Sequence, residues 1–194
     1  MNSNNIRSLI ESGRIFTRED FIFFWSGRKL SKVTKNCFSQ WYPSKFIVGG
    51  KEYQFAEQFM MAKKAELFND VEILPQIMMA SDARTIKRLG REVKNFDPAV
   101  WNEKKFEIVV QGNLAKFSQN HDLRDFILST GDRILVEASP YDKIWGIGMN
   151  ESSQDAIFPE RWKGQNLLGF ALMKVRAILD NLMGQEIKAD APEK

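Results

Sequence analysis

Residues 57–68 read EQFMMAKKAELF, and this run predicts an α-helix that carries both an acid and a base. At about 100° per residue, Glu57 and Lys64 are two turns apart and lie almost in line. Met60, Met61, Leu67 and Phe68 flank that line, whereas Phe55, Phe59 and Ala62 cover the opposite side of the helix. The run therefore places an acid and an amine within an otherwise apolar stripe.

Two interpretations of this helix are open. In the first, Phe55 and Phe59 face the core while Glu57 and Lys64 point to water. In the second, the two charged groups are buried, and charged groups are rarely buried unless they are paired or used. Burial would raise the pKa of the carboxyl group and lower the pKa of the amine. A general acid or base, or a nucleophilic amine, is prepared in this way.

The flanking segments predict a mostly helical α+β fold with a small β-sheet or hairpin. FIFFW (21–25) and RILVEAS (133–139) are typical of buried strands, and KFIVGGKEYQF (45–55) is typical of a hairpin around Gly49-Gly50. Helices are expected over 55–68, over about 70–80 with a bend or delay at Pro75, after an N-cap at Ser81, from Asp97-Pro98 to 117, near 121–130, and from Asn166 onward.

Length and composition suit one domain. We expect an N-terminal arm over 1–20, the domain over 21–183, and a solvated tail over 184–194. The apolar run at 21–25 is far too short to span a bilayer and lacks the flanks of a secretory signal. One cysteine, Cys37, excludes an internal disulfide and suits a reducing compartment, so we expect a cytoplasmic protein without membrane contact. A formal charge of +3 is only mildly basic.

Four cations, Arg84, Lys87, Arg88 and Arg91, share one face of the helix expected after Ser81. Such a stripe could hold a diphosphate or a nucleic-acid backbone. A solvated helix face explains the stripe as well. Gly90 interrupts the stripe, so that Arg91 can be presented separately.

The stretch EASPYDKIWGIG, residues 137–148, places Asp142 and Trp145 three residues apart and follows them with Gly146 and Gly148. It is either a turn that carries a tryptophan or the lip of a pocket that contains an acid. A single histidine, His121, and a single cysteine give no support to a soft-ligand metal site. Phosphate-loop and dinucleotide fingerprints do not occur, so we expect no metal and no cofactor.

Six segments in order, from about residue 21 to 180, resemble the NADAR, or YbiA-like, proteins. YQFAEQFMMAKK is similar to the P-T-x-E-H-x-x-Q-A-x-K helix of that family, and LVEASPYDKIWGIG is similar to its LVE…D-x-x-WG-x-G loop. The other four are FSQWYPSKFIVGGKEYQF, LGRE, Trp101 before a basic helix, and NLLGFALMKVR. A YbiA-like domain is thereby the expected fold.

The resemblance implies N-glycosidase chemistry. Family members cleave the N-glycosidic bonds of ribosylated nucleobase-like compounds, either phosphoribosylamino-pyrimidine intermediates of riboflavin synthesis or ADP-ribose attached to guanine in DNA. Such a compound, with DNA as its carrier in the second case, is the partner expected here. Carried over by position, the catalytic groups are Glu57, Lys64 and Asp142, and the substrate-binding residues are Trp101, Trp145, Arg91, Gly146, Gly148 and Asn166.

The chain departs from the family pattern at three places. Gln58 stands where the family has a histidine, Gln40-Trp41 replaces a residue pair of the FSNF segment, and Ile147 replaces an acid of the glycine loop. Two alternatives belong to other functional classes. A non-catalytic module that binds NAD or ADP-ribose would not need Glu57 with Lys64, and a nucleic-acid-binding domain would depend on the cationic stripe.

Overall fold

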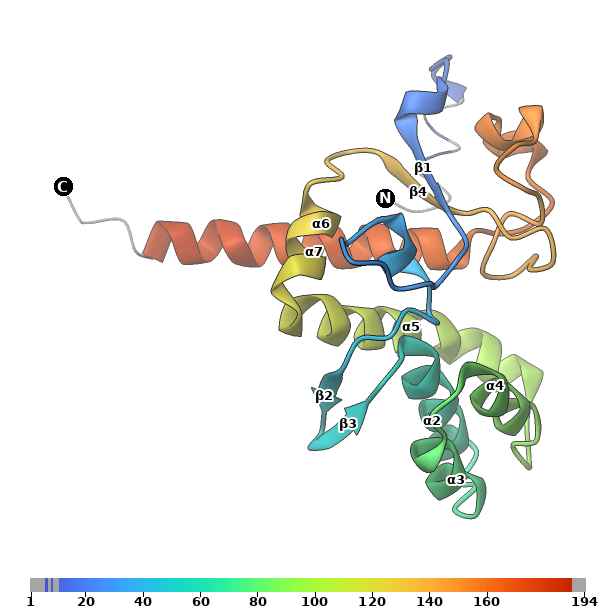
Figure 1. The fold of residues 1–194 in the computed structure, drawn as a ribbon. Helices are drawn as coiled ribbons and strands as arrows, with labels where there is room; N and C mark the ends of the chain where they lie inside the picture. The colour runs from blue at the N-terminus through green and yellow to red at the C-terminus, as the bar shows by residue number, and fades with distance from the viewer. Residues whose placement is uncertain (1–5, 7, 9–10, 190–194) are drawn as a thin grey trace. The chain divides into compact units, whose positions relative to one another are not determined.

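The computed structural model describes residues 6, 8 and 11–189, and the chain divides into two compact units. One unit is Ser26–Asn120. The other combines the described residues up to Trp25 with those from His121 onward. The order of the elements along the chain can be followed in Figure 1.

The unit Ser26–Asn120 begins with a short 3-10 helix, η2 (Lys35–Phe38), and an antiparallel hairpin. The hairpin pairs β2 (Phe46–Val48) with β3 (Lys51–Tyr53). Its two turn residues, Gly49 and Gly50, have φ angles of 57° and 75°. Positive φ at both central residues is what a type I′ hairpin turn requires, so the predicted hairpin is confirmed.

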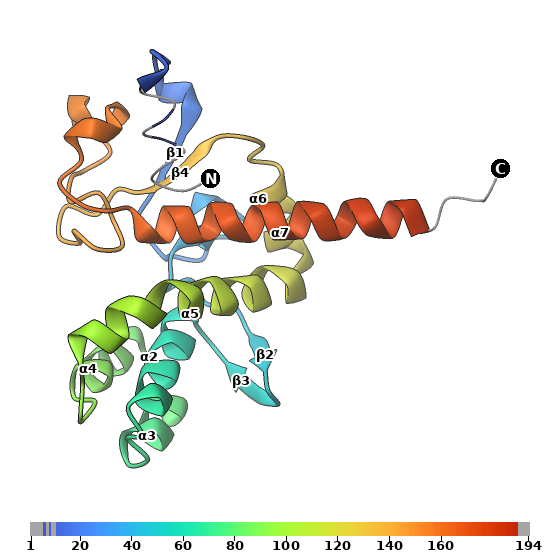
Figure 2. The same ribbon diagram turned by 180° about the vertical axis from the view of Figure 1, so that it is seen from behind.

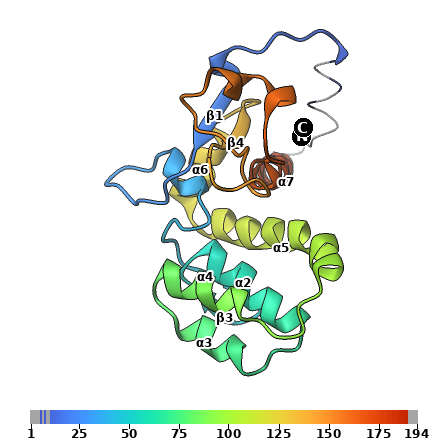
Figure 3. The ribbon, with the colours of Figure 1, turned by 90° about the vertical axis from the view of Figure 1, so that its right-hand side faces the viewer.

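Four helices make up the rest of this unit, and Figure 3 shows α2, α3 and α4 beside one another below α5. Helix α2 packs against each of the other three. The helices are α2 (Ala56–Leu67), α3 (Ile73–Met79), α4 (Ala83–Arg91) and α5 (Pro98–Gln119).

The N-cap of α5 is the one that the sequence predicts, whereas the N-cap of α4 is not. Asp97 caps α5 by accepting hydrogen bonds from the N–H groups of Ala99 and Val100, as the Asp97-Pro98 pair predicts. The expectation that Ser81 caps α4 is wrong. The cap is the next residue, Asp82, whose carboxylate accepts from the N–H of Thr85 at 2.9 Å.

The second unit contains a two-stranded parallel sheet. Strand β1 (Phe21–Phe24) pairs with β4 (Ile134–Glu137), and three of the four β1 residues are buried, as FIFFW predicts. Helices α6 (His121–Leu128) and α7 (Leu167–Ala189) pack together, and α7 also packs on β4 (Figure 2). The described residues of this unit also form the 3-10 helices η1 (Arg18–Asp20), η3 (Gln154–Ile157) and η4 (Pro159–Arg161).

The mostly helical α+β class is confirmed, with two small sheets as its β component. In the range expected as a solvated tail, α7 continues to Ala189, and 190–194 lie outside the described residues. Of the expected N-terminal arm, 1–5, 7, 9 and 10 also lie outside them, while Ile6 and Phe16 are buried. Across the described part of the chain, every helix is too short or too polar to cross a membrane.

A fully buried lysine ties the core of the unit Ser26–Asn120 together. Lys116 of α5 donates hydrogen bonds to the carbonyl oxygens of Cys37 and Ser39, at 2.6 and 3.0 Å. Its ammonium group also lies over the rings of Phe117 and Tyr42. Burial lowers the pKa of Lys116 from 10.5 to about 8. The cation thus holds the end of η2 against α5 at an electrostatic cost.

We therefore expect stability to rise with pH through Lys116. Below about pH 8 both the folded and the unfolded chain hold the proton; between about pH 8 and 10.5 only the unfolded chain does. The Lys116 contribution to the free energy of unfolding should grow by about 3 kcal/mol over this window. Urea unfolding of wild type and Lys116→Met at several pH values measures this as a difference. A difference that is independent of pH would contradict the assignment.

Candidate functional site

Glu57 lies in the first turn of α2 and is buried, with 6% of its surface exposed. Its backbone N–H donates to the carbonyl oxygen of Gln40 at 3.0 Å, which fixes the start of the helix. The first two turns of α2 are buried on every side, and the buried residues include Phe59, Met60 and Met61. The interpretation in which Glu57 points to water is therefore wrong.

Lys64 is half-buried, and three groups surround its amine. Nζ donates to the carbonyl oxygen of Gly90 at 2.7 Å and lies 4.1 Å from the centre of the Phe96 ring and 5.8 Å from that of Trp101. Burial lowers the pKa of Lys64 below its ordinary value. The structure thus brings Lys64 and Trp101 together, in a setting that favours a neutral amine.

The neighbouring Lys63 has different partners. Its Nζ forms an ion pair with Glu66 at 2.7 Å, and it lies 5.6 Å from the ring of Phe59. Adjacent residues of a helix point about 100° apart, so only Lys64 shares the line of Glu57. Two turns separate Glu57 from Lys64, about 11 Å along the helix axis. Glu57 and Lys64 therefore lie on the same side of α2, two turns apart.

Two residues around Lys64 escaped the sequence analysis as contributors. Gly90 supplies the carbonyl oxygen that holds the amine, although only its role in breaking the cationic stripe was considered. Phe96 covers the amine and is itself 41% exposed. A signal for Phe96 existed, because it precedes the N-cap Asp97 by one residue, and Trp101 is four positions inside the helix. These are the two positions of a hydrophobic staple.

Arg91, next to Gly90 at the end of α4, has an exposed side chain. At the position of the family histidine, the Gln58 side chain is buried and donates to the carbonyl oxygens of Ile77 and Met78, at 3.0 and 3.1 Å. Its Oε1 accepts from the N–H of Gln54. This departure from the family pattern therefore serves to join α2 to the end of α3.

In the second unit, the carboxylate of Asp142 shapes the glycine loop. Its Oδ1 accepts hydrogen bonds from the N–H groups of Ile144 and Trp145, at 2.8 and 2.7 Å. Both bonds use the same oxygen. The side chain is half-buried, and Oδ2 receives no hydrogen bond from the described part of the chain.

The glycines of this loop are required by close approaches. A Cβ at Gly146 would lie 2.8 Å from the carbonyl oxygen of Glu137 and 3.0 Å from that of Asp142, closer than such atoms approach. Gly148 has a φ angle of 67°, which disfavours other residues. The two glycines therefore let the loop fold tightly against the end of β4.

Asn166 joins the same loop to β4 and α7. Its Oδ1 accepts from the N–H of Glu137 and its Nδ2 donates to the carbonyl oxygen of Leu135, both at 3.0 Å. The side chain is fully buried, and the backbone has a φ angle of 53°. The Asn166 amide is thus engaged within the protein, where it fixes the carboxyl end of the strand.

Trp145 is half-buried in this loop. Beside the loop, Trp25 and Tyr141 are 46% and 86% exposed, with ring centres 5.9 Å apart. An exposed aromatic pair of this kind was not singled out from the sequence, because Trp25 and Tyr141 are more than a hundred positions apart.

The two residues considered for other chemistry have ordinary settings. Burial raises the pKa of the Cys37 thiol to about 12, so that it stays protonated at neutral pH. His121 is exposed at the first position of α6. Among the described residues, histidine, cysteine and carboxylate side chains form no group of three or more that could hold a metal ion.

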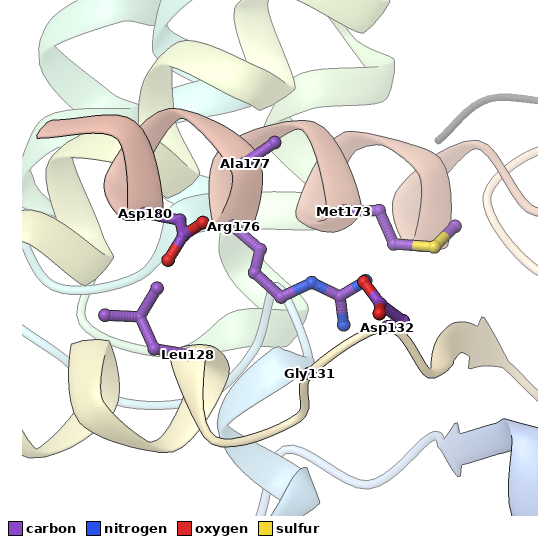
Figure 4. A pocket seen from close by; sticks show the side chains of 7 residues that line it. All are labelled: Leu128, Gly131, Asp132, Met173, Arg176, Ala177 and Asp180. Atoms are coloured by element: carbon purple, nitrogen blue, oxygen red, sulfur yellow. The ribbon is translucent and has the colours of Figure 1, made fainter. Parts of the chain in front are cut away.

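A hollow of about 290 Å³ in the second unit is lined by none of the predicted site residues. Figure 4 shows Arg176 reaching from α7 toward Asp132 at its centre. The Arg176 guanidinium donates to the Thr130 hydroxyl and to the carbonyl oxygen of Arg133, at 2.7 and 2.9 Å. It thereby ties α7 to the turn that precedes β4.

Comparison with known proteins gives consistent matches. A model of the NADAR domain matches residues 23–180. The chain is 46% identical over 163 residues to "N-glycosidase R617" of Acanthamoeba polyphaga mimivirus, covering 81% of this chain and 95% of that protein. It is 31% identical to "Riboflavin biosynthesis protein VVA0006" of Vibrio vulnificus, covering 71% and 34%. The NMR structure of Escherichia coli YbiA superposes with a TM-score of 0.70 at 25% identity, covering 91% and 92%.

Gly90, which holds Lys64, packs against the Met61 side chain, so substitutions at these two residues should have coupled effects on stability. A Cβ at position 90 would collide with the Met61 side chain, so Gly90→Ala should lower the free energy of unfolding by about 1–3 kcal/mol. In a Met61→Ala background the collision is absent, and the same change should cost little. Urea unfolding of the two single variants and the double variant measures the coupling. Additive effects would show that Gly90 does not need the space beside Met61.

Proposed function

The chain belongs to the NADAR domain family, and we propose that it is an N-glycosidase that removes ADP-ribose from guanine. Relatives named N-glycosidases support the glycosidase activity, among them the mimivirus protein that the chain matches over 95% of its length. Guanine as the leaving group is our own assignment, taken from the chemistry of the family.

The observation that carries the proposal is the pair of reactive groups on α2. One helix holds a buried carboxylate, Glu57, and two turns later an amine, Lys64, whose pKa is lowered by burial. Charged side chains are seldom placed in such surroundings without a task. A module that only bound NAD or ADP-ribose would have no need for this combination.

We assign Lys64 as the nucleophile. Its neutral amine attacks the anomeric carbon of the ribose, the C–N bond to Lys64 forms, and the C–N bond to guanine breaks. Glu57 donates the proton that the departing base requires. The ribose ring then opens to a Schiff base, and water hydrolyses it to free ADP-ribose and the regenerated amine. One water molecule is consumed in the cycle.

Direct attack by water is the competing route. In that case a carboxylate stabilises the positive charge that develops on the ribose carbon or deprotonates the attacking water. Glu57 suits this role too, and Lys64 would then stabilise negative charge on the leaving base. The two routes differ in whether a covalent bond to Lys64 ever forms.

The remaining predicted site residues take binding and positioning roles in the proposal. In the unit Ser26–Asn120, Trp101 is assigned to stacking on an aromatic ring of the substrate and Arg91 to binding phosphate. In the other unit, Trp145 is the candidate for stacking. Asp142 shapes the loop through Oδ1, which leaves Oδ2 for the substrate. Asn166, Gly146 and Gly148 act on the substrate through the loop that they hold in place.

A second substrate class has a specific observation in its favour. The Vibrio vulnificus relative is named a riboflavin biosynthesis protein. A phosphoribosylamino-pyrimidine has the same ribose–nitrogen bond and one phosphate, so the same residues could cleave it. A cytoplasmic location suits both substrates and agrees with the single, unpaired cysteine.

The experiment that tests the proposal compares both substrates. Wild-type protein should release free base from an ADP-ribosylated guanine compound, detected by mass spectrometry, faster than from a phosphoribosylamino-pyrimidine. Glu57→Gln should slow release by about 10²–10⁴-fold with the fold unchanged, because it keeps the shape of the side chain and removes proton transfer. Glu66→Gln, on the same helix, is the matched control and should keep its activity. Equal rates for Glu57→Gln and wild type would refute the acid/base role.

Covalent catalysis predicts a trapped adduct on one of two adjacent lysines. Borohydride added during turnover should reduce a Schiff base to a stable amine, and peptide mass spectrometry should locate it on Lys64. Lys63→Ala should leave trapping and activity unchanged, because Lys63 is paired with Glu66. Lys64→Ala should abolish both. A fully active Lys64→Ala variant without an adduct would establish direct attack by water.

A further inference from the structure

The positive charge of the protein is concentrated in one of its two units. Ser26–Asn120 contains 16 lysines and arginines against 10 acids, a net charge of +6, although the whole chain carries only +3. The rest of the chain is therefore net negative. A local excess of this kind attracts polyanions much more strongly than the overall charge suggests.

Within this unit, exposed cations gather on two neighbouring segments. Helix α4 presents one row, and the loop that precedes η2 presents another. We name the two rows together the α4 basic surface; it consists of Arg84, Lys87 and Arg91 on the helix and Arg28, Lys29 and Lys32 in the loop, all with exposed side chains.

Trp41 holds the two rows together. The ammonium group of Lys87 lies 5.7 Å from the centre of the Trp41 ring. On the loop side, a Cβ at Gly27 would lie 2.9 Å from Trp41 atoms, so the backbone passes this residue in close contact. The carbonyl oxygen of Arg28 accepts from the Asn36 side chain at 2.9 Å, which fixes the next residue of the loop. The half-buried Trp41 therefore contacts both α4, through Lys87, and the start of the loop that carries the other three cations.

Acids neutralise only a part of this surface. Arg88, which also lies on α4, forms an ion pair with Glu92 at 2.8 Å. The carboxylate of Asp82 lies near Arg84 but accepts the hydrogen bond that caps the helix. Lys87, Arg91 and the two loop lysines form no ion pair with any residue that the structure describes. Exposed cations beside an aromatic ring are typical of proteins that bind single-stranded nucleic acid, with phosphates on the charges and a base against the ring.

We propose that the α4 basic surface binds the sugar–phosphate backbone of single-stranded nucleic acid. This inference rests on the proposed function, because Gly90, in the last turn of α4, holds Lys64 through its carbonyl oxygen. A strand that follows α4 thus passes the amine and presents one of its nucleotides there. A single strand suits this geometry, because a base inside a duplex is inaccessible to an enzyme that acts on it.

Binding of an unmodified, fluorescein-labelled 12-nucleotide DNA strand tests the surface without any need for turnover. Fluorescence anisotropy at several salt concentrations gives the affinity and its salt dependence. Each phosphate contact contributes about −0.7 to the slope of log K against log salt for a single strand. Arg84→Ala/Lys87→Ala should therefore make the slope shallower by about 1.4 and weaken binding roughly 25-fold near 0.1 M salt.

The matched control removes the same charge elsewhere in the unit. Lys45→Ala/Lys104→Ala deletes two exposed lysines that are paired with Glu52 and Glu103, and it should leave the slope within about 0.3 of wild type. Equal losses in both double variants would reduce the effect to net charge and overturn the proposal. Binding to phosphatidylserine vesicles but not to the strand would overturn it as well. Strand binding without glycosidase activity would refute only the proposed function.

Discussion

Helix α2 is buried on every face over its first two turns, and its neighbours in the unit Ser26–Asn120 are built around that constraint. Two of the neighbouring helices have a glycine where they contact a large side chain of α2. Gly90 of α4 faces Met61, and at Gly112 of α5 a Cβ would lie 2.6 Å from the ring of Phe59. Close packing of this kind leaves few arrangements for the polar groups on α2. Glu57 and Lys64 are consequently held in fixed positions by the packing of apolar residues around them.

Features set by neighbouring residues could be predicted from the sequence. The two-residue hairpin turn at Gly49-Gly50 and the cap at Asp97 each depend on residues within a few positions of one another. The error at α4 is also local, since Ser81 and Asp82 are adjacent and both are good N-cap residues. The fold class and the family followed because several such segments occur in a fixed order.

The helical wheel of α2 shows what could not be predicted. Periodicity assumes one apolar and one wet face, whereas α2 has no wet face over its first turns. The setting of Lys64 depends on a backbone carbonyl at Gly90 and on a ring at Phe96, which are 26 and 32 positions away. A backbone carbonyl has no signature in a sequence. Asn166 is a similar case, since its motif indicates a site residue while its amide is consumed by the backbone of β4.

The different surroundings of Lys63 and Lys64 have a consequence for ligand design. An aldehyde forms an imine only with a neutral amine, and a lysine with an ordinary pKa is about 0.1% neutral or less at pH 7. The amine of Lys63 is occupied by its ion pair with Glu66, whereas burial favours the neutral form of Lys64. An aromatic aldehyde could also stack against Phe96, which is partly exposed beside the amine. Reversible covalent inhibitors could thus discriminate between two adjacent lysines of one helix.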